Sequence, residues 1–185
     1  MASLQLIDTN IMGVYQIKPF SVTDQRGKVV KEYDKKALES KGIIFTPCES
    51  LIIESKKGVL RGLHFQFGEK QDKIVRCISG EVWAVIVDLR TNSSTLGQWL
   101  NIDINNASEV YVPGGCAFGT LAMTDSYILC MFGEAYDAAK DSGIWWNDET
   151  IGVKWPMDAV SDIIVSEKDN SLMSYNDYLV RIELK

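Results

Sequence analysis

The central part of the chain repeats one pattern, and this pattern constrains the fold more than any other feature. Between residues 59 and 136, short apolar runs rich in Val, Ile and aromatic side chains alternate with turn signals. The turn signals are residues 79–80 (SG), 91–94 (TNSS), 105–108 (NNAS), 113–115 (PGG) and 124–126 (TDS). A spacing of roughly 8 to 12 residues is typical of an all-β sandwich or barrel, because a fold of alternating strands and helices would show helical patterns between the strands. We therefore expect an all-β fold.

The two ends of the chain carry weaker signals, which favour short peripheral elements. Two helices are expected: residues 34–40 (DKKALES), which Gly42 would terminate, and one short helix within residues 166–178. The other expected elements are one or two edge strands in residues 1–20, a turn at residues 23–27, strands at residues 29–33 and 45–55, and a tryptophan-rich cover at residues 140–155. No further segment calls for a core of its own, so residues 1–185 are expected to form a single domain.

Length and composition restrict the class of protein. With 185 residues and a 46% hydrophobic content, the chain can bury a core without disulfides or metals. No apolar run approaches the roughly 18 residues of a membrane helix, and the N-terminus lacks the pattern of a signal peptide, so we expect a cytoplasmic protein with no membrane partner. A net charge of −6 and a pI near 4.9 argue against a nucleic-acid partner, because phosphate backbones require a basic face.

The cysteines are widely spaced and form no CxxC pair. With one histidine in the chain, a zinc site would need cysteine ligands from scattered positions. We therefore expect buried free thiols and no metal site. The cysteines are Cys48, Cys77, Cys116 and Cys130.

The only histidine, His64, lies in residues 58–76 (GVLRGLHFQFGEKQDKIVR), where cations and a glutamine alternate with apolar residues. From these residues alone, two interpretations are open. A histidine titrates near physiological pH and can transfer protons. A lone histidine in an apolar strand, however, is more often a hydrogen-bonded core residue.

The motif around His64 is the centre of a longer match. From residue 24 to residue 169, the chain resembles the dTDP-4-dehydrorhamnose 3,5-epimerase family. This resemblance implies a cupin-type jelly roll with short peripheral helices, which acts without cofactor on a nucleotide-linked 4-keto-6-deoxyhexose. It also implies a homodimer that serves deoxysugar biosynthesis for a surface polysaccharide or a secondary metabolite. The matched segments are residues 24–27 (DQRG), 61–66 (RGLHFQ), 73–76 (KIVR), 80–82 (GEV), 87–90 (VDLR), 97–99 (GQW), 146–148 (WND), 151–156 (IGVKWP) and 166–169 (SEKD).

The resemblance implies a proton-transfer site. A C–H bond beside the C4 ketone of the sugar is acidic, because its carbanion spreads onto the ketone oxygen as an enolate, and neutral imidazole is a suitable base near pH 7. The family's base is the histidine of the RGLHFQ motif, and an aspartate near the C-terminus orients it, which implies His64 and Asp169. Lys73, with Arg61, would supply positive charge near the enolate oxygen.

The same match implies substrate-binding residues. Arg26 corresponds to the family's diphosphate-binding arginine, whose guanidinium fits phosphate oxygens. From the residues alone, Arg26 could instead be a solvated charge in a turn, Asp169 an acid at a helix N-terminus, and Lys73 an exposed residue of a charged turn. The substrate-binding candidates are Arg26, Lys31, Glu49, Arg61, Gln66 and Tyr136, and no cofactor is expected.

The chain departs from the family at a second His-Asp pair and at the proton donor. Phe118 stands where the family has the second histidine, and Ala84 stands where it has the partner aspartate. Losing both leaves no orphaned buried charge. Counting on from Phe118 to the family's donor tyrosine ends at Met131, which cannot donate a proton. Tyr127, Tyr136 or water could serve instead, and strand parity favours Tyr127.

The nucleotide side of the family's site differs as well. Glu49 and Leu51 stand where the family presents Gln and Asn to the nucleotide, and Lys31 replaces a Glu. Sites built for hydrogen bonding discriminate strongly when a partner is missing, so the base need not be thymine. A cytosine amine could donate to Glu49, which makes CDP a candidate beside dTDP.

These features favour one function over two alternatives. The favoured function is an epimerase that inverts only C3, because the base, its orienting acid and the enolate stabiliser remain while the donor for a second inversion is missing. One alternative is a full 3,5-epimerase that uses another phenol as donor. The other is a catalytically silent cupin that binds a nucleotide sugar.

Overall fold

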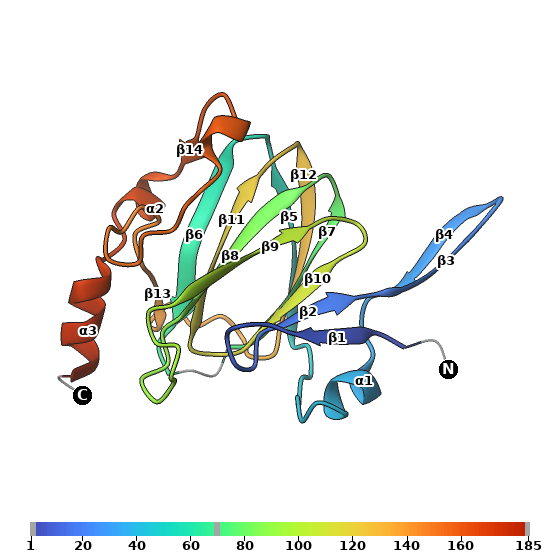
Figure 1. The fold of residues 1–185 in the computed structure, drawn as a ribbon, viewed down its shortest axis with the longest axis horizontal. Helices are drawn as coiled ribbons and strands as arrows, with labels where there is room; N and C mark the ends of the chain where they lie inside the picture. Colours follow the sequence, from blue (N-terminus) through green and yellow to red (C-terminus); the bar gives the residue numbers. More distant parts are fainter. Residues whose placement is uncertain (1–2, 69–70, 184–185) are drawn as a thin grey trace.

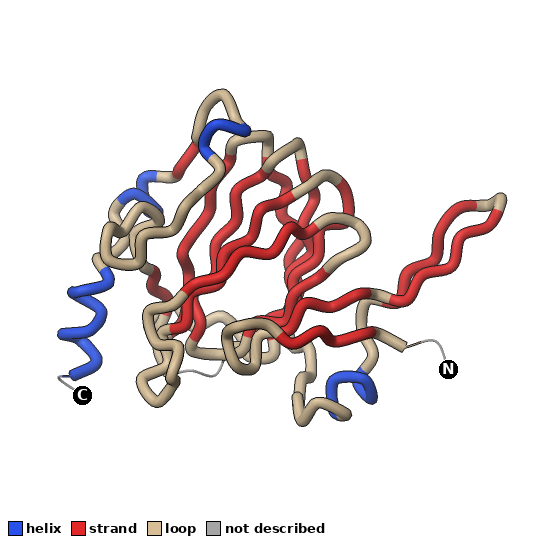
Figure 2. The backbone as a smooth tube through the Cα atoms, viewed as in Figure 1, coloured by secondary structure: helices blue, strands red, loops and turns tan. Residues whose placement is uncertain are grey.

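Two antiparallel sheets pack against each other around a shared core (Figures 1 and 2). The structure is a computed structural model that describes residues 3–68 and 71–183. The first sheet has the order β1 (Gln5–Asp8), β2 (Tyr15–Lys18), β10 (Glu109–Val112), β7 (Lys73–Ser79), β12 (Ser126–Phe132) and β5 (Glu49–Ser55). The second has the order β13 (Asp141–Gly143), β6 (Val59–Gln66), β11 (Cys116–Ala122), β8 (Val82–Asp88) and β9 (Trp99–Ile104), with β14 (Ile164–Val165) parallel to β6.

Both faces of the second sheet are covered, which explains its continuous apolar runs. On β8, Ala84 and Ile86 face the first sheet, whereas Val85 and Val87 pack against the C-terminal segment. That segment carries a short 3₁₀ helix (Met157–Ala159), α2 (Glu167–Asn170) and α3 (Tyr175–Glu183), coloured orange to red in Figure 1. No helix among the described residues is long and apolar enough to cross a bilayer.

A two-stranded hairpin of β3 (Phe20–Asp24) and β4 (Gly27–Lys31) projects from the body of the molecule (Figure 1). The predicted turn at residues 23–27 lies at its tip, and the strand expected at residues 29–33 starts two residues earlier, at Gly27. Among the described residues, β3 and β4 pair only with each other, and the Val29 side chain is 75% exposed. An exposed, apolar hairpin of this kind is a surface that commonly pairs with another chain.

The all-β jelly-roll prediction is confirmed, and so is the first helix. Asp34 caps the N-terminus of α1 (Lys35–Glu39), because its carboxylate accepts hydrogen bonds from the backbone N–H groups of Lys36 and Ala37. The strand predicted at residues 45–55 begins only at Glu49, because Pro47 cannot donate to a strand ladder.

The single helix predicted within residues 166–178 is wrong, since the chain forms α2 and α3 instead. Ser166 begins α2 by accepting a hydrogen bond from the N–H of Asp169. The chain then leaves the helix so that Met173 can bridge to Ile144. Ser174 starts a new helix by accepting from the N–H of Asp177.

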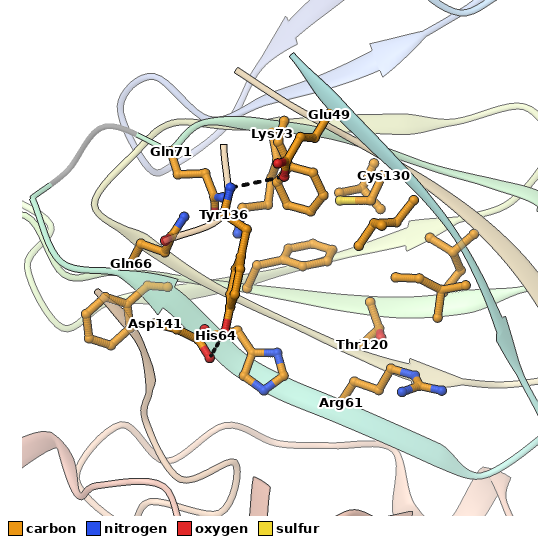
Figure 3. Close-up of a pocket in the computed structure, with 17 residues that line it drawn as sticks. Glu49, Arg61, His64, Gln66, Gln71, Lys73, Thr120, Cys130, Tyr136 and Asp141 are labelled. Atoms are coloured by element: carbon orange, nitrogen blue, oxygen red, sulfur yellow. Dashed lines mark hydrogen bonds between the residues drawn. The ribbon is translucent and has the colours of Figure 1, made fainter. Parts of the chain in front are cut away.

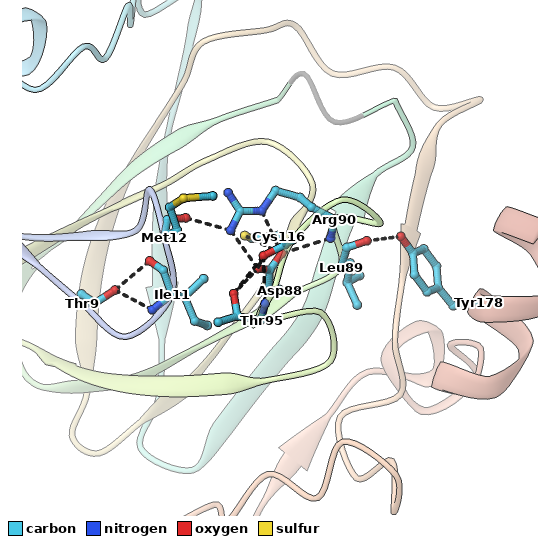
Figure 4. A network of polar contacts seen from close by, with 10 residues as sticks. Thr9, Ile11, Met12, Asp88, Leu89, Arg90, Thr95, Cys116 and Tyr178 are labelled. Atoms are coloured by element: carbon cyan, nitrogen blue, oxygen red, sulfur yellow. Dashed lines mark hydrogen bonds and ion pairs between the residues drawn. The ribbon is translucent and has the colours of Figure 1, made fainter.

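A polar network at the end of β8 ties three parts of the fold together (Figure 4). Arg90 donates to both carboxylate oxygens of buried Asp88 at 2.8 Å and to the carbonyl oxygen of Met12 at 2.8 Å. The Tyr178 hydroxyl of α3 donates to the carbonyl of Leu89. The network therefore joins the N-terminal loop, β8 and the C-terminal helix.

Candidate active site

A cavity of about 450 Å³ lies between the two sheets (Figure 3). One wall comes from β5, β7 and β12 of the first sheet, and the other from β6 and β11 of the second. Its charged and titratable lining side chains are Glu49, Arg61, His64, Lys73, Cys130, Tyr136 and Asp141. The cavity thus gathers most of the predicted site residues, although they are far apart in sequence.

His64 and Asp169 form a close pair at the second-sheet wall. Nε2 of His64 lies 2.7 Å from Oδ1 of Asp169, and the Asp169 side chain is 5% exposed against 37% for His64. An ionised carboxylate only accepts hydrogen bonds, so Nε2 carries the proton in the neutral ring and Nδ1 is left as the acceptor. Nδ1 has no hydrogen-bond partner within residues 3–68 and 71–183. The exposure of His64 and its place in the cavity lining argue against its interpretation as a hydrogen-bonded core residue.

The backbone of Gly62 forms a hydrogen bond to the second carboxylate oxygen of Asp169. Its backbone N–H donates to Oδ2 of Asp169 at 3.1 Å. Its φ is +112°, and a Cβ at this position would lie 2.6 Å from the carbonyl oxygen of Phe118. Only glycine fits where β6 approaches β11 this closely. The RGLHFQ motif therefore supplies both the histidine and the backbone geometry that fixes its partner.

Lys73 is buried, which rules out the exposed-turn interpretation. The residue is 5% exposed, and its ammonium lies 5.9 Å from the ring centre of Phe118 and 5.8 Å from that of Phe132. Among the described residues, the ammonium has no hydrogen-bond or ion-pair partner. Burial lowers the pKa of Lys73. A buried cation of this kind favours an anionic ligand or a developing negative charge.

Four other predicted residues line the same cavity. Arg61 donates to the Ser55 hydroxyl at 3.2 Å, and the Gln66 carbonyl accepts from the Asp137 N–H at 2.7 Å. Glu49 accepts from the backbone N–H of Tyr136 at 3.0 Å, so its carboxylate is already engaged at the cavity mouth. The Tyr136 hydroxyl donates to Asp141 at 3.2 Å. Asp141, Thr120 and Gln71 also line the cavity and carry no signal in the sequence that would have found them.

Arg26 and Lys31 are not brought to this cavity, because the β3–β4 hairpin carries them away from the body of the chain (Figure 1). The Arg26 side chain is 85% exposed and pairs with Asp24 at 2.6 Å. Lys31 pairs with Asp34 at 3.2 Å. Within one copy of the chain, neither residue lines the cavity.

The cavity lining contains a thiol one residue before the position expected for the proton donor. Met131 faces away from the cavity and packs against a separate core cluster. Tyr127 is 46% exposed and does not line the cavity either. The lining positions of β12 are Ile128, Cys130 and Phe132. Met131, the residue that the count from Phe118 reaches, is the neighbour of Cys130 on β12, so the two side chains lie on opposite faces of the strand.

The free cysteines are only partly as expected. Cys77, Cys116 and Cys130 are buried, but Cys48 is exposed. In the described part of the chain, no group of three or more His, Cys, Asp or Glu side chains is arranged to hold a metal ion.

The family model, the related sequences and a solved structure all match this chain to the same kind of enzyme. A family model described as dTDP-4-dehydrorhamnose 3,5-epimerase matches residues 8–177. A relative of that name from Methanothermobacter thermautotrophicus is 39% identical over 176 residues, covering 92% of this chain and 94% of the relative. One from Escherichia coli is 36% identical over 186 residues, covering 98% and 99%. The solved structure of a dTDP-6-deoxy-D-glucose-3,5-epimerase from Legionella pneumophila, in complex with dTDP-4-keto-L-rhamnose, matches with a TM-score of 0.90 at 28% identity, covering 98% and 96%.

Proposed function

This chain belongs to the dTDP-4-dehydrorhamnose 3,5-epimerase family. We therefore propose that it epimerises a nucleotide-linked 4-keto-6-deoxyhexose at a carbon next to the ketone. The observation that carries the proposal is that His64, which is hydrogen-bonded to Asp169, lines the same cavity as the buried Lys73. Base, orienting acid and enolate stabiliser lie in one site, as the reaction requires.

The proposed first step is removal of a proton by His64. The unprotonated Nδ1 takes the hydrogen from the carbon beside the ketone, and the electron pair of the C–H bond moves into the enolate. Asp169 stabilises the imidazolium that forms, because its carboxylate bonds the other ring nitrogen. The Lys73 ammonium would stabilise the enolate oxygen.

The number of carbons inverted separates two candidate functions. The names of the relatives favour inversion at both C3 and C5, the alternative drawn from the sequence, over inversion at C3 alone. A specific observation keeps the C3-only function as the second candidate: Phe118 lines the cavity beside His64, and Ala84 is buried in the core, so the family's second His-Asp pair is absent from this site.

For the nucleotide, the names of the relatives favour dTDP. The CDP hypothesis rests on the changes at Glu49, Leu51 and Lys31, of which Lys31 lies outside the cavity lining and Glu49 already accepts the N–H of Tyr136 with one carboxylate oxygen. We therefore propose dTDP as the preferred carrier and keep CDP as the comparison in the assay.

We further propose that two copies complete each other's sites. One side of the cavity is lined by β5, an edge strand whose Leu51 and Ile52 are 54% and 70% exposed. The β3–β4 hairpin carries Arg26 away from the cavity of its own chain. In a homodimer that covers these exposed surfaces, Arg26 of one copy would bind the diphosphate of the substrate held by the other.

Incubation in heavy water tests the function. With dTDP-4-keto-6-deoxyglucose, deuterium at C3 and C5 supports the 3,5-epimerase, and deuterium at C3 alone supports the 3-epimerase. The His64→Asn variant should lose exchange by at least about 10²-fold. Exchange no faster than in buffer, on either the dTDP- or the CDP-linked sugar, would leave a silent binding protein as the better account.

A further inference from the structure

The cavity wall opposite His64 carries a single thiol among apolar side chains. His64 lies on β6 of the second sheet and Cys130 on β12 of the first, so the two face the cavity from opposite walls (Figure 3). In the strand register, Cys130 pairs with Leu51 of β5 and Val75 of β7, which also line the cavity. An apolar surface of this kind does not hold ordered water well. Solvent is therefore a poor proton source at this wall.

Lys73 provides a second, independent sign that an anion forms here. It lies two residues before Val75 on β7, and its ammonium is directed toward the rings of Phe118 and Phe132, both of which line the cavity. The residue is 5% exposed, and its ammonium has no polar partner among the described residues. A charge held in this way is stabilised when negative charge appears nearby.

We propose that Cys130 is the catalytic proton donor, returning hydrogen to the substrate carbon on the face opposite His64. The proposal rests on the proposed epimerase function. It assigns the donor role to a side chain that counting from the sequence motif misses.

The proposed step balances. The substrate C–H electron pair enters the enolate as Nδ1 of His64 takes the proton. The enolate then takes the proton of the Cys130 S–H group on the other face, and the S–H electron pair stays on sulfur as a thiolate beside Lys73. After the product leaves and solvent refills the cavity, water protonates the thiolate and takes the proton from the imidazolium. Inversion results because the two protons travel on opposite faces.

Tyr136 is the competing donor, and its geometry places it on the wrong side. Its hydroxyl donates to Asp141 of β13, and β13 pairs with β6 so that Gly143 lies opposite His64. The phenol therefore lies on the same side of the cavity as the base, as Figure 3 shows. A donor on the base's own side would return hydrogen without inversion.

The protonation state of the thiol agrees with this role. Burial raises the pKa of Cys130 to about 11, against the opposing effect of Lys73. The thiol therefore stays protonated at neutral pH, as a donor must, and its acidity is similar to the ordinary phenol pKa of about 10.

The test separates exchange from inversion. In heavy water with dTDP-4-keto-6-deoxyglucose, Cys130→Ala should still incorporate deuterium through His64, but it should form the inverted product at least about 10²-fold more slowly. Cys130→Ser, which keeps the size but not the acidity, should behave alike and serves if the alanine variant does not fold. Cys48→Ser, a change at an exposed cysteine outside the cavity lining, is the matched control.

Each outcome decides something. Inversion at the parental rate in either Cys130 variant would overturn the donor role, and so would a loss of inversion with retained exchange in Tyr136→Phe but not in Cys130→Ala. A parent protein that exchanges no hydrogen with the dTDP- or CDP-linked sugar would overturn the proposed function and the donor role with it. Inversion that proceeds without Cys130, in a protein that does exchange hydrogen, would overturn only the donor role.

Discussion

At the scale of single residues, the proposed base depends on Asp169. One carboxylate oxygen bonds Nε2 of His64, and the other accepts the N–H of Gly62. Without its charge, the imidazolium formed in the reaction loses its stabilising partner. Asp169→Asn should therefore lower the rate of deuterium exchange by about 10²–10⁴-fold, measured by mass spectrometry of the nucleotide sugar.

The control for this prediction is Glu167→Gln, a change of an exposed acid on the same helix α2. It should exchange deuterium at the parental rate. A purely structural role predicts a different result, in which Asp169→Asn melts at a lower temperature and still exchanges deuterium like the parent. Asp169 would in that case be only an acid at the start of a short helix.

Sequence reasoning at this scale succeeds where one motif carries the chemistry. The pairing of His64 with Asp169, separated by 105 positions, follows from the resemblance and from no periodicity of the chain. The burial of Lys73 was only one of two open interpretations, because the charged turn before it pointed to exposure. Lys73 is buried because its side chain lies on the face of β7 that meets the cavity. Which face this is depends on how β7 pairs with its neighbours β10 and β12.

At the scale of elements, Asp88 anchors the end of β8. Burial alone would raise the pKa of Asp88, but hydrogen bonds from Arg90, Ser93 and Thr95 outweigh it and lower the pKa to about 2. A carboxyl group that is more acidic in the folded chain stabilises the fold above its unfolded pKa of about 4, and this contribution is lost as the pH falls through about 2.

Asp88→Asn should therefore destabilise the protein more at pH 6 than at pH 2, by about 2 to 3 kcal/mol in the free energy of unfolding. Urea unfolding of the parent and the variant at both pH values measures this difference. Asp158→Asn, at an exposed acid of the 3₁₀ helix, should show no such pH dependence. An equal effect of Asp88→Asn at pH 6 and pH 2 would contradict the role assigned to its charge.

Elements also show where sequence reasoning fails. The strand and turn rhythm predicts the jelly roll, because each strand needs only its own pattern and a turn to be recognised. The same pattern does not predict which side chains of a strand face the core after a turn. Between Phe118 and β12, one residue decides whether Met131 or Cys130 faces the cavity, and the ladder with β7 shifts register between Tyr127 and Ile128. Local patterns do not encode such a shift, whereas the packed sheet does.

At the scale of the whole molecule, one chain leaves exposed the surfaces that a second copy could cover. The hairpin side chains Val22 and Val29 are 52% and 75% exposed, and Ile52 on the edge strand β5 is 70% exposed. Arg26 lies at the tip of the hairpin, where its guanidinium donates to the carboxylate of Asp24. Arg26→Ala should therefore weaken binding of the substrate diphosphate, seen as a rise in KM of at least about tenfold.

Complementation tests whether Arg26 acts on its own chain or on its partner. His64→Asn and Arg26→Ala chains, each impaired alone, should regain activity when they are co-expressed. If the hairpin acts across the dimer, each mixed dimer holds one site with an intact His64 and an intact Arg26. Random pairing then gives about a quarter of the parental number of sites. If Arg26 acts within its own chain, every site carries one defect and mixing restores nothing. Sedimentation at assay concentration supplies the companion measurement, because a monomer there would contradict the proposed dimer directly.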